Sequence, residues 1–151
     1  MVILKKSNKA RIGIVAASFN EFITKRLLNA CFMELRRQGL GDGHITVVWV
    51  PGSFEIPLTA LKLAQRKDID AVICLGAVIR GETYHFEVIS NECARGIMEV
   101  SLATTKPVIM GVLTTDTVAQ AQARAAEKSV NNKGCDAARA ALEMIVLFNK
   151  I

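Results

Sequence analysis

The segment from Arg80 to His85 contains the groups that phosphate binding and proton transfer require. If a helix begins near His85, the backbone N–H groups just before it are free to bind an anion such as phosphate. His85 can itself accept or donate a proton near neutral pH. The segment is therefore a candidate reaction site, although a histidine in a loop is more often structural.

Other candidate residues also follow apolar segments. Phe19 could stack on a planar ligand or pack into the core. The Ser53-Phe54-Glu55 segment could bind hydroxyl groups or cap a helix. Arg124 lies among alanines, where its guanidinium could bind a phosphate or remain solvated.

Several common functional motifs are absent from the sequence. It has no Walker A motif, no G-x-G-x-x-G after the first apolar segment and no G-x-S-x-G. Nucleotide hydrolysis, dinucleotide binding and serine hydrolysis are therefore disfavoured. The four cysteines lie far apart, without histidines at metal-ligand spacing, so we expect buried thiols and no metal site.

Composition limits the expected partners and location. The net charge is +5, but basic residues are interspersed with acidic ones and aromatic residues make up only 5%, which fits small anionic substrates at least as well as nucleic acid. The longest apolar runs are shorter than the roughly 18 residues that a membrane span needs, and no signal peptide is visible. We expect a cytoplasmic protein without nucleic-acid or membrane partners. The 51% hydrophobic content favours a homo-oligomer.

Apolar segments alternate with segments of helical spacing along the chain. Strands are predicted at residues 12–17, 45–50, 71–79 and 108–113. Helices are predicted at residues 19–38, 54–67 and 86–103, from about Asp116 with an Asp or Thr cap, and from Lys133 or Gly134 to Lys150.

Strands without polar alternation, each followed by a helix, are typical of a parallel sheet covered on both faces. We therefore predict one domain, residues 1–151, with a three-layer α/β/α sandwich around four parallel strands. Residues 1–5 could form a short strand that pairs with a neighbouring subunit. Ligands of such sheets gather at the carboxyl ends of the strands, where the candidate residues follow.

Several segments, in this order, resemble the lumazine synthase family, also called the riboflavin synthase beta-chain family. They are residues 14–20, 50–57 and 76–87, followed by 111–114 and 132–134. Residues 76–87 resemble the family signature G-x-x-I-R-G-x-T-x-H-F. The resemblance covers nearly the whole chain and implies a flavodoxin-like fold.

The resemblance also implies a reaction. Members of the family condense 5-amino-6-ribitylaminouracil with 3,4-dihydroxy-2-butanone 4-phosphate to 6,7-dimethyl-8-ribityllumazine, releasing phosphate and two waters. This is the penultimate step of riboflavin biosynthesis and uses neither a metal nor an organic cofactor. The chain is accordingly expected to be a transferase.

Roles of individual residues follow from the same resemblance. Those expected to contact the pyrimidine and its ribityl chain are Phe19, Ser53, Phe54, Glu55, Ala77, Val78, Ile79 and Met110. Those expected to hold the butanone phosphate are Glu82 and Thr83 through their N–H groups, Arg124 and, as a weaker candidate, Lys133. His85 is expected to transfer protons.

The family's pocket lies between adjacent subunits, so Met110 and Arg124 would face His85 of a neighbour. Residues 127–132 form a segment one residue longer than in capsid-forming members, which favours a homopentamer over the alternative icosahedral 60-mer. Riboflavin synthase is a candidate partner. The sequence departs from the family at Met110, where an aromatic residue is common, at Phe54, which varies among aromatics, and at Arg124-Ala125-Ala126, which replaces R-A-G.

Two other classes of protein compete with the enzyme. A non-catalytic flavin or pterin binder could use the same aromatic ring and helix ends, although His85 and Arg124 together argue against it. A flavodoxin-like or receiver-type signalling domain is disfavoured, because a receiver needs an acidic cluster after the first strand and Ser18-Phe19-Asn20 supplies none.

Overall fold

A computed structural model describes residues 9–127 and 131–151 of the chain. The order of its elements is β1 (Ile12–Ala17), α1 (Glu21–Arg37), β2 (Ile45–Val50), α2 (Ile56–Ala64), β3 (Ala71–Ile79), α3 (His85–Thr104), β4 (Val108–Thr115), α4 (Val118–Arg124) and α5 (Lys133–Phe148). Short 3-10 helices, Asp42–His44 and Ser53–Glu55, precede β2 and α2. The strand predicted at residues 1–5 lies outside the described residues.

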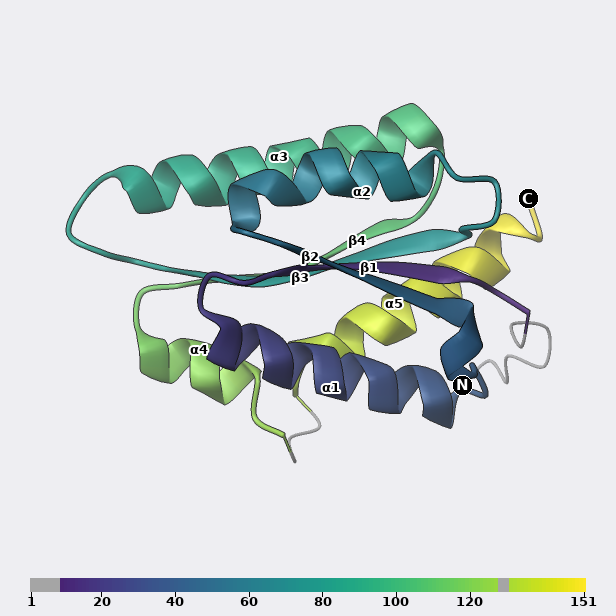
Figure 1. Ribbon diagram of the computed structural model, residues 1–151, viewed down its shortest axis with the longest axis horizontal. Coiled ribbons are helices and arrows are strands. Elements are labelled where there is room, and N and C mark those ends of the chain that lie inside the picture. Colours follow the sequence, from purple (N-terminus) through teal and green to yellow (C-terminus); the bar gives the residue numbers. More distant parts are fainter. Residues whose placement is uncertain (1–8, 128–130) are drawn as a thin grey trace.

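The four strands form one parallel sheet in the order β2-β1-β3-β4. Helices α2 and α3 cover one face, and α1, α4 and α5 cover the other (Figure 1). The prediction of a three-layer α/β/α sandwich with a flavodoxin-like sheet is confirmed. Because each crossover helix packs on a face of the sheet, the central strands β1 and β3 are almost entirely buried.

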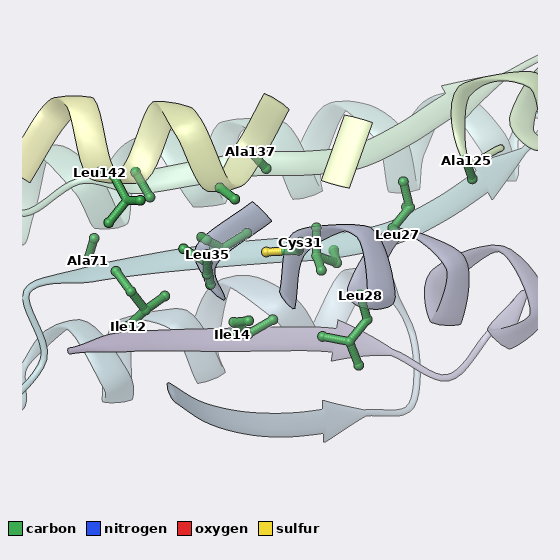
Figure 2. Packing of buried hydrophobic residues seen from close by; sticks show 14 of the residues in the cluster. Ile12, Ile14, Leu27, Leu28, Cys31, Leu35, Ala71, Ala125, Ala137 and Leu142 are labelled. Carbon is green, nitrogen blue, oxygen red and sulfur yellow. The ribbon is translucent and has the colours of Figure 1, made fainter. Parts of the chain in front are cut away.

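Alternate residues of the central strands supply two separate cores. Ile12 and Ile14 of β1 face α1 and α5, whereas Val15 and Ala17 face α2 and α3. Figure 2 shows the first of these cores, in which Cys31 and other side chains of α1 lie between β1 and α5. The period-two alternation of the strand side chains therefore determines which residues pack on each face of the sheet.

Three helix boundaries differ from the prediction for local reasons. Helix α1 begins at Glu21 rather than Phe19, because Asn20 adopts a left-handed backbone conformation with φ of 59°. Helix α2 is shorter than predicted; Pro57 falls in its first turn, as expected, and the residues before it form the 3-10 turn. Helix α4 begins at Val118, two residues after Asp116, and its predicted threonine cap is confirmed, because the Thr117 side chain accepts the Gln120 N–H at 3.1 Å.

Other boundaries moved by only a few residues. Strand β4 continues to Thr115, two residues beyond the predicted end, and α5 ends at Phe148. Helix α3 includes His85 as its first residue. Within residues 9–127 and 131–151, no helix is long and apolar enough to cross a membrane.

The sheet opens at the carboxyl end of β3. Pairing between β1 and β3 stops at Ala16 opposite Leu75, whereas pairing between β3 and β4 continues to Ile79 opposite Thr115. The last residues of β3 therefore have a partner strand on one side only. Helices α1, α3 and α4 all begin at this end of the sheet (Figure 1).

Candidate active site

A cleft of about 610 Å³ lies at the carboxyl ends of β1, β2 and β3, and we call it the strand-end cleft. Nine of the residues singled out from the sequence line it: Phe19, Ser53, Phe54, Glu55, Ala77, Val78, Ile79, Thr83 and His85. The fold thus brings together residues from four separate segments. Phe86 and Ile89 of α3 also line the cleft; sequence analysis missed them because they read as ordinary helix residues.

Phe19 is held at the mouth of this cleft by its backbone. Its N–H donates to the Pro51 carbonyl at 3.0 Å, and the Ser18 N–H donates to the Val50 carbonyl at 2.8 Å. The ring is 72% exposed, so the alternative of core packing is wrong for the isolated chain. An aromatic face in this position is available for stacking against a planar ligand.

The open edge of β3 presents backbone groups to the same cleft. Asn20 Nδ2 donates to the Ala77 carbonyl at 2.8 Å and extends the edge of the sheet by one hydrogen bond. The Arg80 N–H donates to the Thr115 carbonyl of β4, at 2.9 Å. Since backbone groups of successive strand residues point to opposite edges, the N–H and C=O of Ile79 point away from β4. They form a donor–acceptor pair suited to the edge of a heterocycle.

The loop between β3 and α3 offers free amides beside the histidine. Among the described residues, no acceptor is found for the N–H groups of residues 81–84. The His85 N–H reaches only the Thr83 hydroxyl, at 3.4 Å. These groups stand at the positive end of a 20-residue helix, which favours an anion. Glu82 is exposed on this loop and does not itself line the cleft.

The other three candidate residues lie elsewhere on the chain. Met110, Arg124 and Lys133 line a second cleft of about 380 Å³ that runs along the outer edge of β4 against α5, and we call it the β4-edge cleft. Arg124 donates from Nη1 to the Gln120 carbonyl at 3.1 Å, and Lys133 pairs with Asp136 at 2.8 Å. Within one chain these cations are therefore not part of the strand-end cleft.

A buried asparagine lies directly before Lys133, at the start of α5. Asn132 is fully buried; its Oδ1 accepts the Gly134 N–H at 2.8 Å and its Nδ2 donates to the Ala126 carbonyl at 3.1 Å. It caps α5 and ties that helix to the segment after α4. The sequence carries a signal for this cap, an asparagine directly before a predicted helix.

The cysteines behave as buried thiols, as predicted. Cys31, Cys74 and Cys93 are buried and Cys135 is half-buried, all without disulfides. Burial raises the pKa of the Cys31 thiol to about 12 and that of Cys93 to about 11. Such thiols stay protonated and are poor nucleophiles at neutral pH.

The fold and the strand-end cleft define a class: an α/β sandwich that receives a small ligand where parallel strands end and helices begin. A sequence model of the 6,7-dimethyl-8-ribityllumazine synthase family matches residues 9–149 of the 151-residue chain. The chain therefore belongs to the lumazine synthase family, a family of transferase-type enzymes that form lumazine in riboflavin biosynthesis.

Proposed function

We propose that this chain condenses 5-amino-6-ribitylaminouracil with 3,4-dihydroxy-2-butanone 4-phosphate to give 6,7-dimethyl-8-ribityllumazine. The observation that supports this most strongly is the strand-end cleft, in which an exposed aromatic ring, a free strand edge, free amides and a histidine converge. Each of these groups suits one part of the two substrates. We also propose that the reaction takes place in the cytoplasm.

The pyrimidine has a natural position in the strand-end cleft. Phe19 stacks on its ring, while the Ile79 backbone meets its amide edge and Ala77 and Val78 pack against it. The Ser53-Phe54-Glu55 turn lines the same cleft and binds the hydroxyl groups of the ribityl chain. This pose directs the amino group of the pyrimidine toward His85.

The butanone phosphate occupies the loop before α3. The N–H groups of Glu82 and Thr83 hold its phosphate at the helix start. The pyrimidine amine attacks the ketone, and water leaves to form an imine. Elimination then releases phosphate, and the second amine closes the ring with loss of a second water. His85 moves protons in these steps, and orientation of the two substrates supplies much of the remaining rate.

Completion of the site requires a second copy of the chain. Arg124, with Lys133 as the weaker candidate, would neutralise the phosphate, and Met110 would pack against the pyrimidine, but all three lie in the β4-edge cleft. In our proposal the β4-edge cleft of one subunit faces the strand-end cleft of its neighbour. An isolated monomer would then be nearly inactive.

The assembly that provides this arrangement is proposed to be a homopentamer. Residues 128–130, within the segment that distinguishes a pentamer from a 60-subunit capsid, lie outside the described residues. Light scattering decides between the two assemblies, since a mass near a megadalton would contradict the pentamer. Riboflavin synthase remains a candidate partner in this proposal.

Turnover of the two substrates tests the proposed function. Purified assembly should accelerate the appearance of the lumazine chromophore over the slow uncatalysed condensation, and Arg124→Ala should lose most of that acceleration, by about 100-fold. Affinity for the pyrimidine should persist in the variant, because its ring binds in the other cleft.

The exposed Lys62→Ala variant, on α2 and outside both clefts, serves as the control and should leave turnover unchanged. A well-assembled protein that binds the pyrimidine without any acceleration would instead be a binder of flavin-like or pterin-like compounds.

A further inference from the structure

Arg80 is the hub of a small polar cluster beside the strand-end cleft. Its Nε donates to Asp116 Oδ1 at 2.8 Å, and its Nη1 donates to Glu87 Oε1. The guanidinium also stacks on the Phe86 ring, 4.4 Å from the ring centroid. Both carboxylates are thus held by one planar group, and Arg80 itself does not line the cleft.

The partners of Arg80 belong to two elements, α3 and the end of β4, that lie next to the loop of residues 81–84. Glu87 and Phe86 lie in the first turn of α3, directly after His85, and Asp116 follows the last residue of β4. The loop of residues 81–84 is therefore flanked by this cluster on both sides, by Arg80 before it and by the first turn of α3 after it. Within the described residues, the N–H groups of that loop have no hydrogen bonds that would fix its shape.

The cluster also continues toward the β4-edge cleft. The Asp116 N–H donates to Gln120 Oε1 at 2.9 Å, and the Gln120 carbonyl accepts the hydrogen bond from Arg124. Arg80 and Arg124 are thereby both linked to residues 116–120, which span the turn after β4 and the first turn of α4. The bond from Arg80 to Asp116 consequently ties the loop of residues 81–84 to the carboxyl end of β4.

We propose that Arg80 is a positioning residue that holds the loop amides and His85 in the geometry needed to bind a phosphate ester. This inference rests on the proposed function for the identity of that ester. Arg80 acts through Asp116 and the first turn of α3 rather than by touching the phosphate.

The solvent exposure of Arg80 and Asp116 indicates that their ion pair affects the nearby loop and not the stability of the whole fold. The side chains of Arg80 and Asp116 are 44% and 63% exposed, and ion pairs of this kind contribute little to global stability. Two carboxylates and one aromatic face nevertheless restrict a single guanidinium far more than one pair would. Loss of Arg80 should therefore loosen the loop without unfolding the chain.

The main alternative is that Arg80 turns from its partners and binds the phosphate directly. The two roles predict opposite effects for Asp116→Asn. If Arg80 contacts the phosphate, removing a competing negative charge should strengthen phosphate binding. If Arg80 positions the loop through Asp116, the same change should weaken it.

The experiment measures binding of inorganic phosphate by calorimetry, and the KM of each substrate, in the assembled protein. Arg80→Gln should weaken phosphate binding and raise the KM for the butanone phosphate about 10-fold, while the KM for the pyrimidine stays within about twofold. Asp116→Asn should weaken phosphate binding about threefold, and Arg80→Lys should fall between wild type and Arg80→Gln. The double variant should be no worse than Arg80→Gln alone, because both changes break the same contact.

Arg66→Gln is the matched control. Arg66 makes a two-bond pair with Asp68 at 3.0 and 2.7 Å, on the turn before β3, and should leave both KM values unchanged. Tighter phosphate binding in Asp116→Asn, additive effects in the double variant or equal changes in both KM values would overturn the inference. So would a wild-type protein that binds no phosphate. Phosphate binding that follows the expected pattern without any turnover would support the role of Arg80 and reject the proposed reaction.

Discussion

Phe19 and Asn20 are adjacent residues after β1 whose side chains have different roles. Phe19 leaves its ring exposed over the strand-end cleft, whereas Asn20 turns back and bonds to the Ala77 carbonyl. The left-handed backbone of Asn20 makes this division possible, and asparagine tolerates that conformation better than most residues. A planar ligand in the strand-end cleft would thus meet an aromatic face supported by an anchored turn.

Glu34 is a buried carboxylate held by two arginines. Its side chain is only 5% exposed and lies between Arg37, at 2.8 Å, and Arg139 of α5, at 3.2 Å. Hydrogen bonds from Arg37, together with Gln38 and the charge of Arg139, lower the pKa of this carboxyl from 4.5 to about 2. The group therefore links α1 to α5 most strongly while it is ionised.

This pKa predicts how stability depends on pH. Because the folded pKa is lowered, the stabilisation by Glu34 is fully present above about pH 4.5 and is lost as the pH falls toward 2. Wild type should exceed Glu34→Gln by about 2 kcal/mol in the free energy of unfolding at pH 7, and this difference should shrink below pH 4.5. Urea unfolding of both proteins from pH 7 to pH 3 measures it; a difference that stays constant would rule out the ion network.

At the scale of elements, α5 approaches α1 more closely than side chains normally allow. A Cβ atom added to Gly134 would lie 2.0 Å from the Leu27 carbonyl oxygen, a backbone atom that cannot rotate away. The glycine thus lets the start of α5 lie against α1. This contact also explains why Asn132 can cap α5 from a buried position.

Gly134→Ala should therefore destabilise the protein by roughly 3 kcal/mol or more, or prevent folding, because the two helices must separate. Gly43→Ala is the matched control, since nothing lies within 4 Å of its added Cβ, and it should change stability by less than about 0.5 kcal/mol. Thermal unfolding compares the two variants. Equal melting temperatures would show that α1 and α5 do not need this contact.

The elements themselves were largely predictable, because the apolar runs that form β1 and β3 have no polar alternation. The helix starts were harder, since they depend on single residues such as Asn20 and Thr117. Candidate site residues could be found because they follow strand ends. The pairing of Arg80 with Asp116 could not, because 36 residues separate them and only the β3–β4 register brings them together.

At the scale of the whole molecule, the candidate residues other than Glu82 divide between two clefts. The strand-end cleft gathers residues from β1, β2, β3 and the start of α3, while the β4-edge cleft lies along the outer strand of the sheet. In the proposed assembly each reaction site combines one cleft from each of two neighbouring copies. The oligomer would then be a requirement for catalysis rather than an addition to it.

Subunit mixing tests this central claim directly. His85→Gln changes only the strand-end cleft and Arg124→Ala changes only the β4-edge cleft, so each variant alone should be strongly impaired. When the two carry different tags, are co-expressed and assemble at random in equal amounts, about one quarter of the interfaces should combine two intact clefts. We predict that doubly tagged assemblies regain about a quarter of wild-type turnover. Activity that remains at the mean of the two parent variants would contradict a site shared between subunits.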